Sequence, residues 1–455
     1  MKKPKKILIF IDLEIILRHF IANKTFKELN KEFNLIYVFN QDRYDFKKDD
    51  IVKNNIDRRK IRTTALPRKR MGRWFYLYLV TVLRQQVGKK NFRSRINMEF
   101  SRLGKRNVYL ALIAGLPVIY SIFRYFFIKI MGIHPDINDI IKKEKPDLII
   151  HPSILQGYFI NDLLRNYYKN KKSIPLIFLM NSWDNPSQKA FCTGSPTKLV
   201  VWGEQTKKYA IQYMKVNPKD IECFGAAQFE IYKKKTPYNK EQLSSIFKAD
   251  KNKKTILYAG AGNGKYEPVY LQLLDNYISE GYLPNCQIIY RPHPWRGGLA
   301  KGEKDFFSMN FKNIIMDPTM EDYYRQVIKE PRGVFLTDYK NSRDLMALID
   351  AVISPLSTML LESILNGKPI LMFFPEKEKG RGYSTEEVHF SEFLDLDIIN
   401  KCFSESQFLN SCQQLYKQIN DKNVSSKLKK SSIYFLTPSK ISYGKQLKNL
   451  VKKYL

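Results

Sequence analysis

Cysteines, acidic residues and long apolar runs are scarce in this chain of 455 residues, and each shortage excludes a class of protein. The five cysteines are scattered with no close pair, which argues against a disulfide framework or a zinc knuckle and fits a reducing cytoplasm. The run at 108–123 has only 16 residues, whereas a membrane-spanning helix needs about 20. The apolar start at 7–11 is interrupted by Asp12 and Glu14, so we expect no signal peptide.

Basic residues outnumber acidic ones by 77 to 44, which gives a net charge of +33. The excess is uneven, because residues 58–106 contain 16 Lys or Arg and a single acid, Glu99. Such a segment favours a polyanionic partner, which can be nucleic acid, an anionic membrane or a phosphate-bearing substrate. A lysine-rich composition alone explains part of the excess. No nucleic-acid motif is present, so we expect no nucleic-acid partner.

Short apolar runs alternate with helical stretches in both halves of the chain. Continuously apolar runs are typical of parallel strands covered on both faces. Two successive series predict an α/β protein with two doubly wound, Rossmann-like domains. We place them at 1–247 and 248–430, and expect a last helix at 431–455 to pack on the first domain. The predicted strands are 7–11, 35–39, 148–150, 175–180, 199–202, 255–259, 287–290, 334–337, 351–354 and 369–373.

A helical, basic insertion at about 58–133 contains no clear strand. Its aromatic and basic helices match anionic lipid headgroups. An ordinary helical hairpin packed on the sheet is the alternative, and the run at 108–123 leaves insertion into the membrane open.

A His-Pro pair ends one predicted strand. Arg291-Pro292-His293-Pro294 follows the strand at 287–290. The flanking prolines restrict the backbone, and open α/β sheets bind ligands at the carboxyl ends of their strands. His293 and the cationic Arg291 can therefore bind a phosphate there, although a His-Pro pair can also be structural.

Hydroxyl residues follow the strand at 351–354. Ser357 and Thr358 stand where a helix N-cap belongs, and Glu362 comes about one turn later. A helix start of this kind can bind phosphate, with Glu362 reaching ribose hydroxyls, or it can simply be a cap. After the strand at 255–259, Gly262, Asn263 and Lys265 form a second candidate phosphate loop, or a turn that requires glycine.

These segments resemble a known family. His-Pro followed by Asp-x-x-Ile-Ser-x-x-Ser-Thr-x-x-x-Glu-x-x-x-x-Gly-Lys-Pro is similar to the donor half of GT-B-fold glycosyltransferases of bacterial surface polysaccharides. That group includes sialyltransferases and CDP-glycerol glycerophosphotransferases. Segments around Trp183, Trp202 and Phe224 resemble capsule and lipopolysaccharide transferases, and the resemblance covers about 148–375. Pro355-Leu356 departs from the glycerophosphotransferase pattern, which argues against glycerol phosphate.

The resemblance implies a transferase that moves a sugar from a nucleotide-sugar donor to a lipid-linked or membrane-proximal surface glycan. His293, Ser357 and Thr358 would bind the donor phosphate and Glu362 the ribose. Without an Asp-x-Asp motif, we expect no metal and no cofactor. We expect a cytoplasmic protein attached peripherally to the inner membrane.

An acceptor hydroxyl needs a base, which should be a carboxylate at a strand end of the first domain. Asp184 is the first choice, followed by Asp12 and Glu14, although Asp184 can instead form an Asx-turn. His151 and Trp183 are candidates for the acceptor side. The alternatives are a nucleotide-sugar 2-epimerase, which shares the two-domain architecture but belongs to another class, and a CDP-glycerol-type glycerophosphotransferase.

Overall fold

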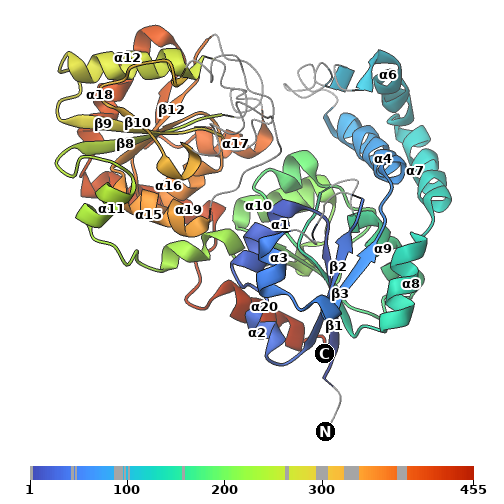
Figure 1. Cartoon of the computed structure of the whole chain (residues 1–455). Helices are drawn as coiled ribbons and strands as arrows, with labels where there is room; N and C mark the ends of the chain where they lie inside the picture. Colours follow the sequence, from blue (N-terminus) through green and yellow to red (C-terminus); the bar gives the residue numbers. More distant parts are fainter. Residues whose placement is uncertain are drawn as a thin grey trace. The chain divides into compact units, whose positions relative to one another are not determined.

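A computed structural model of the chain describes residues 4–42, 46, 49–86, 96, 99–100, 103–155, 159–261, 266–293, 306–321, 338–376 and 387–455. The chain divides into two compact units. Unit 1 consists of Met1–Gln228 and Tyr434–Leu455, and unit 2 is Phe229–Ile433. Each unit is built around one parallel sheet with helices on its faces (Figure 1).

Unit 1 has a seven-stranded sheet in the order β3-β2-β1-β4-β5-β6-β7. Its strand order reverses between β1 and β4, which makes that pair the topological switch point. The strands are β1 Lys6–Ile11, β2 Asn34–Asn40, β3 Ile61–Thr64, β4 Leu148–His151, β5 Leu176–Leu179, β6 Lys198–Val201 and β7 Ile221–Cys223. The helices are α1 Glu14–Ile16, α2 Lys27–Asn30, α3 Asp50–Asn55, α4 Arg68–Gln86, α6 Lys105–Ala114, α7 Pro117–Met131, α8 Pro135–Glu144, α9 Phe159–Lys169, α10 Glu204–Tyr209 and α20 Tyr443–Lys452.

Unit 2 has a six-stranded sheet in the order β10-β9-β8-β11-β12-β13, which reverses between β8 and β11. Its strands are β8 Lys254–Ala259, β9 Cys286–Arg291, β10 Ile314–Met316, β11 Ala351–Ser354, β12 Ile370–Phe373 and β13 Asn400–Cys402. Its helices are α11 Lys240–Ile246, α12 Glu267–Ser279, α15 Tyr339–Leu348, α16 Met359–Asn366, α17 Val388–Leu394, α18 Phe408–Gln418 and α19 Lys422–Phe435, the last of which ends in unit 1.

The β8 strand shows why the middle of a central strand is apolar. Ile256 and Tyr258 pack with α12 and α18 on one face of the sheet, while Leu257 and Ala259 pack with α11 and α15 on the other. Figure 1 shows these two helical layers on opposite faces of the unit 2 sheet. A strand covered on both faces has no position that favours a polar side chain.

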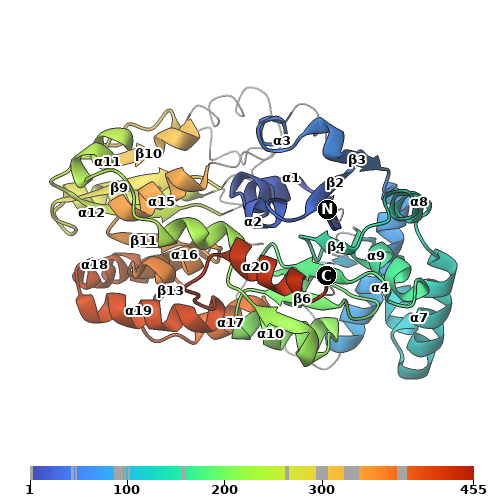
Figure 2. The same cartoon turned by 90° about the horizontal axis from the view of Figure 1, so that it is seen from below.

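The structure corrects the predicted boundary at 247/248. Residues 229–247 belong to unit 2, because Leu243 and Phe247 lie in the core formed by β8 and α15. At the other end of the chain, Tyr443, Leu447 and Val451 of α20 pack into the core of unit 1. Figure 1 and Figure 2 show this helix lying beside α2 of unit 1.

The insertion was predicted to lack strands, and this prediction is wrong. Residues Ile61–Thr64 form β3, which pairs in parallel with β2 along Tyr37–Asn40. The structure also contains β7, β10 and β13, which were not predicted, while the predicted strand at 334–337 lies outside the described residues. All four additional strands are edge strands of their sheets.

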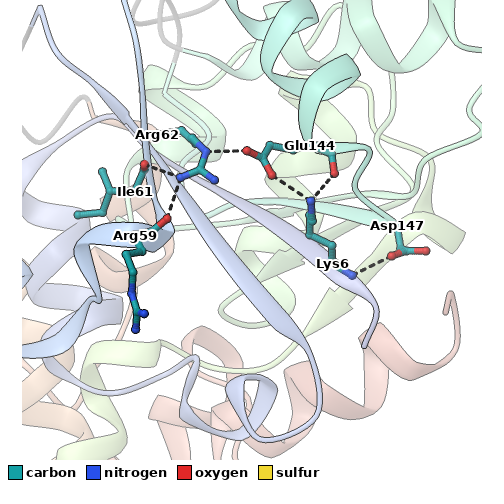
Figure 3. A network of polar contacts seen from close by, with 6 residues as sticks. All are labelled: Lys6, Arg59, Ile61, Arg62, Glu144 and Asp147. Carbon is teal, nitrogen blue, oxygen red and sulfur yellow. Dashed lines mark hydrogen bonds and ion pairs between the residues drawn. The ribbon is translucent and has the colours of Figure 1, made fainter. Parts of the chain in front are cut away.

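A network at the amino end of the unit 1 sheet joins β1, β3 and the end of α8 (Figure 3). Glu144, the last residue of α8, accepts hydrogen bonds from Arg62 Nε at 2.6 Å and from Lys6 Nζ at 3.0 Å. The backbone N–H of Lys6 donates to Asp147 at 2.7 Å. Burial opposes ionisation of Glu144, but the hydrogen bonds from Lys6 and Arg62 outweigh it, so the pKa of this carboxyl is lowered.

Candidate functional site

Two predicted donor segments follow β9 and β11, the strands on either side of β8, at the carboxyl edge of the unit 2 sheet. His293 lies two residues beyond β9 and is half-buried. Ser357 and Thr358 follow β11, which borders the switch point together with β8. Because all strands of this sheet are parallel, these residues lie at one edge of the sheet, where doubly wound folds bind their ligands. The third segment, with Gly262, Asn263 and Lys265, lies outside the described residues.

The start of α16 has the residue types expected of a phosphate-binding turn. Thr358 occupies the N-cap position, and its side chain makes no capping hydrogen bond. The Ser357 hydroxyl lies 3.0 Å from that of Ser354. The helix ends at Gly367 in the left-handed conformation with φ 66°, which glycine adopts without steric cost. The hydroxyl of Thr358 is therefore not used to cap its own helix.

Glu362, the predicted ribose ligand, is buried and accepts a hydrogen bond from the hydroxyl of Tyr232. Burial, and then the charge of Glu362, raises the pKa of Tyr232 well above its ordinary value. Tyr232 was not predicted as a site residue, because it lies far from Glu362 in the chain, in the segment assigned to the first domain. A ribose would have to share this carboxylate with the tyrosine.

Arg291 was predicted to contact the donor, and the structure gives it a partner. Its guanidinium is buried, forms an ion pair with Asp317 and donates from Nη1 to Ser342 at 3.2 Å. Asp317 directly follows β10. It was not predicted, because β10 is too short to be recognised from its sequence. The contacts of Arg291 fix the end of β9, from which His293 extends.

Glu267 contributes a second set of contacts at the carboxyl edge of the unit 2 sheet. This fully buried carboxylate, at the first position of α12, accepts hydrogen bonds from the backbone N–H of Ala261 and from the hydroxyl of Tyr290, both at 2.7 Å. It thereby links the end of β8 to β9. The Pro268 that follows it is a helix-start signal that could have identified it.

In unit 1, the switch point contains two of the predicted residues. His151, at the end of β4, lies with Nε2 3.5 Å from Oδ2 of Asp12, which follows β1. Both side chains are buried. The Nδ1–H of His151 donates to the carbonyl of Phe10 at 3.1 Å, which turns Nε2 toward Asp12. The Asp12–His151 pair can hold one proton between its two atoms.

Burial determines the charge of the histidines at this edge. It lowers the pKa of His151 to about 4, although the hydrogen bond with the backbone of Phe10 acts in the opposite direction. Burial, and then Arg18, lowers the pKa of His19 to about 3, although a hydrogen bond with the backbone of Asn181 acts in the opposite direction. His19 belongs to the π-helical turn Leu17–Ala22 and was not singled out from the sequence. Both imidazoles are neutral near neutral pH.

The other predicted unit 1 residues lie in three different settings. Glu14 is exposed at the first position of α1. Asp184 is buried, pairs with Lys189 and accepts a hydrogen bond from the Ser182 hydroxyl at 2.8 Å. Trp183 is also buried and donates from Nε1 to Gln205 at 2.7 Å, which makes it a packing residue in this structure.

Within the described ranges, no group of three or more His, Cys, Asp or Glu side chains is arranged to hold a metal ion.

No protein-family model and no curated protein sequence matches the chain. Solved structures do match along its whole length. A UDP-N-acetylglucosamine 2-epimerase from Rickettsia bellii has a TM-score of 0.51 at 11% identity, covering 99% of this chain and 97% of that one. The Neisseria meningitidis enzyme bound to UDP-GlcNAc has a TM-score of 0.50 at 13% identity, covering 98% and 100%. S. aureus MnaA with UDP has a TM-score of 0.50 at 11% identity, covering 99% and 96%.

The fold is of the GT-B type. The predicted pair of Rossmann-like domains with a helical basic insertion is therefore confirmed. At these identities the similarity extends to the fold and no further.

Proposed function

We propose that the protein is a glycosyltransferase that uses a nucleotide-sugar donor and a hydroxyl acceptor on a surface glycan. The observation behind this proposal is that His293 follows β9 and that Ser357 and Thr358 follow β11, so all three belong to the carboxyl edge of the unit 2 sheet, on either side of β8. A diphosphate there would meet hydroxyl donors, an imidazole and the N-terminus of α16, all of which favour an anion. The solved structures with this fold that contain UDP or UDP-GlcNAc support a uridine nucleotide as the first donor to test.

The transfer requires stabilisation of the nucleotide that leaves. In the proposed role, His293 and the two hydroxyls hydrogen-bond the phosphate oxygens as charge develops on them. Fixed groups of this kind can act without a metal, which is how we expect the enzyme to work. Arg291 acts indirectly, because its pairing with Asp317 holds the strand from which His293 extends.

The acceptor hydroxyl must lose a proton. We assign this task to the switch point of unit 1, where the Asp12–His151 pair lies and Glu14 provides an exposed carboxylate. Asp184 remains a predicted base, but its carboxylate is already engaged by Lys189 and by the Ser182 hydroxyl. His151 is placed to orient Asp12, because its Nε2 faces the Asp12 carboxylate.

A nucleotide-sugar 2-epimerase is the second candidate function, favoured by the epimerase structures with this fold. Incubation of the full-length protein with UDP-GlcNAc alone separates the two candidates. Inversion at C2 of the sugar, seen by proton NMR without any acceptor, would establish the epimerase and refute the transferase. Release of UDP only when a glycan acceptor is added supports the transferase.

Donor binding is tested by thermal shift with UDP-, GDP-, CMP- and CDP-linked donors. A ligand that binds the native state raises the melting temperature as its concentration rises. Replacing a hydroxyl that hydrogen-bonds a charged phosphate costs about 1.5–3 kcal/mol, so Thr358→Ala should weaken donor binding by about tenfold or more. Ser431→Ala, which removes an exposed hydroxyl from α19, is the matched control.

His293→Ala should abolish turnover without unfolding unit 2, because a half-buried residue after a strand contributes little packing. Circular dichroism and the melting temperature check the fold. Wild-type turnover in this variant, or unchanged donor affinity in Thr358→Ala, would refute the assigned phosphate site.

A further inference from the structure

The α6–α7 arm, residues 105–131, exposes more large apolar side chains than any other described part of the chain. Val118, Ile122, Phe126 and Ile130 are 74%, 56%, 53% and 77% exposed. They recur every four residues and therefore lie along one face of α7. Tyr109 and Ile113 continue the apolar surface on α6. Soluble monomers rarely expose contiguous apolar surface on this scale, so the arm requires a partner.

The opposite face of the arm is already covered. On α7, Phe123, Phe127 and Met131 pack against Trp74 and Tyr78 of α4. On α6, Val108 and Ala111 pack against Leu79, Val80 and Leu83 of the same helix. Figures 1 and 2 show α7 lying beside α4. A helix that is apolar on both the covered and the uncovered side is typical of a protein core or of contact with lipid.

The positive charge of the arm favours an anionic partner. Residues 105–131 contain four basic residues and no acidic one. Lys105, Arg106 and Lys129 are exposed beside the apolar surface, and Arg68, Lys69 and Arg73 are exposed in the first turns of α4. A second copy of the chain would bring like charges together, which disfavours self-association. An anionic lipid surface complements both the charge and the apolar stripe.

The dimensions of the arm indicate how it meets lipid. At about 1.5 Å per residue, the 10 residues of α6 and the 15 of α7 extend about 15 and 22 Å. The hydrocarbon core of a bilayer is about 30 Å thick. No single described helix is long and apolar enough to cross it, and α6 and α7 meet at a bend of 102°. An interfacial position fits these lengths.

We propose that the α6–α7 arm docks unit 1 on an anionic lipid bilayer and lies in the interface without crossing it. Val118, Ile122, Phe126 and Ile130 enter the boundary between headgroups and acyl chains. Lys105, Arg106 and Lys129 contact the anionic headgroups.

The arm is joined firmly to the predicted acceptor side of unit 1. Trp74 Nε1 donates to the buried Asp162 of α9 at 3.0 Å, and Arg70 pairs with the same carboxylate. From the arm itself, Arg124 Nη2 donates to the carbonyl of Thr193 at 3.0 Å, and Tyr78 of α4 donates to the carbonyl of Gln188. These contacts hold the loop that follows Asp184. A docked arm would therefore present that loop to a membrane-anchored acceptor, a step that rests on the proposed transferase function.

Vesicle flotation of the full-length protein tests the docking. We expect binding to phosphatidylcholine vesicles that contain phosphatidylglycerol, and weak or no binding to phosphatidylcholine alone. Ile122→Glu combined with Ile130→Glu should lower the partition coefficient by at least about tenfold, because a charge must then enter the apolar boundary. The matched control is Ile433→Glu on α19, since Ile433 is 51% exposed and Ile122 is 56% exposed. The control should bind like the wild type.

Charge reversal tests the electrostatic contribution. Each basic residue near an anionic surface contributes about 1 kcal/mol, so Lys105→Glu with Arg106→Glu should weaken binding by about tenfold or more and reduce its salt dependence. Lys427→Glu with Lys430→Glu, on the exposed side of α19, is the control pair.

Three results would overturn the inference. They are wild-type binding in the Ile122→Glu/Ile130→Glu variant, absence of wild-type binding to anionic vesicles, and a wild-type dimer in ultracentrifugation that this variant dissociates. The thermal shift with nucleotides is measured in parallel. A variant that loses vesicles but keeps its nucleotide response leaves the donor site intact, so failure of the docking and failure of the proposed function are distinguishable.

Discussion

Buried ionisable groups have opposite charge states at the two ends of the unit 1 sheet. At the amino end, Lys6 and Arg62 surround Glu144, and the pKa of this carboxyl is lowered because both cations hydrogen-bond it against the effect of burial. At the carboxyl end, burial lowers the pKa of His151 to about 4 and that of His19 to about 3. The pKa falls at both ends, but one group is kept charged and the other groups are kept neutral.

This difference separates stability from chemistry. Charges that satisfy one another at the amino end join β1, β3 and α8, and they serve the fold (Figure 3). A neutral imidazole beside Asp12 at the switch point can orient that carboxylate, and this is the edge where doubly wound sheets bind ligands. Substitutions at the two ends should therefore have opposite consequences, with activity lost at one and stability lost at the other.

The largest expected effect is at the carboxyl end. Asp12→Asn should lower the turnover of the enzyme by about 10²–10⁴-fold, the usual contribution of a general acid or base. His151→Gln should give a smaller loss and shift the pH profile, because it acts through Asp12. Steady-state kinetics against pH measures both. The melting temperature shows whether each variant is folded.

Glu14→Gln and Asp184→Asn identify the base. The variant with the largest loss of turnover marks the carboxylate that accepts the proton. If Asp12→Asn retains turnover within about twofold of the wild type while Asp184→Asn does not, the assignment to the switch point is wrong and the original first choice from the sequence stands.

At the amino end we expect a loss of stability without a loss of turnover. Glu144→Gln leaves Lys6 and Arg62 without their carboxylate. Removal of one partner from a buried pair costs about 3–5 kcal/mol, and the partial exposure of both cations reduces this to about 1–3 kcal/mol. Denaturant unfolding measures the change. Asp57→Asn, which breaks an exposed pair with Arg59, should leave stability unchanged, and an equal loss in both variants would contradict the comparison.

The position of a strand within its sheet explains which strands the sequence predicted. Nine of the ten predicted strands correspond to β1, β2, β4, β5, β6, β8, β9, β11 and β12, and all of these lie inside the sheets. The strands that were not predicted, β3, β7, β10 and β13, are the four edges. An edge strand is only partly covered, so Ile61–Thr64 can contain Arg62 and Thr63 without an apolar run.

Residues of the candidate site were predictable where the signal was local. His293, Ser357 and Thr358 each follow an apolar strand, and a strand end is visible in the sequence. Partnerships were not predictable, because Asp12 and His151 are separated by 139 positions and meet only through the pairing of β1 with β4. Asp184 meets Lys189 through the π-helical turn Asn185–Lys189, which differs from the α-helical spacing that sequence patterns assume.

The smallest expected effect is the pH dependence of unit 1 stability. The groups at the two ends of the sheet should change the stability in different pH ranges. For His19 and His151 the folded pKa is lowered, so the unfolded chain binds more protons below about pH 6.5, its ordinary histidine value. Their stabilising effect is present above that value and is lost as the pH falls toward about 4 and about 3. Glu144 and Asp147 also have lowered pKa values, so their effect is present above the ordinary carboxyl values, 4.5 and 3.8, and is lost below them.

Melting temperatures of the wild type, His19→Gln and Glu144→Gln across this pH range test the assignment. His19→Gln should flatten the curve at the higher pH, because a glutamine does not take up a proton. Glu144→Gln should flatten it only at the lower pH. If both variants flattened the same part of the curve, the two ends of the sheet would not differ in the way that their contacts indicate, and the neutral state of His19 would lose its support.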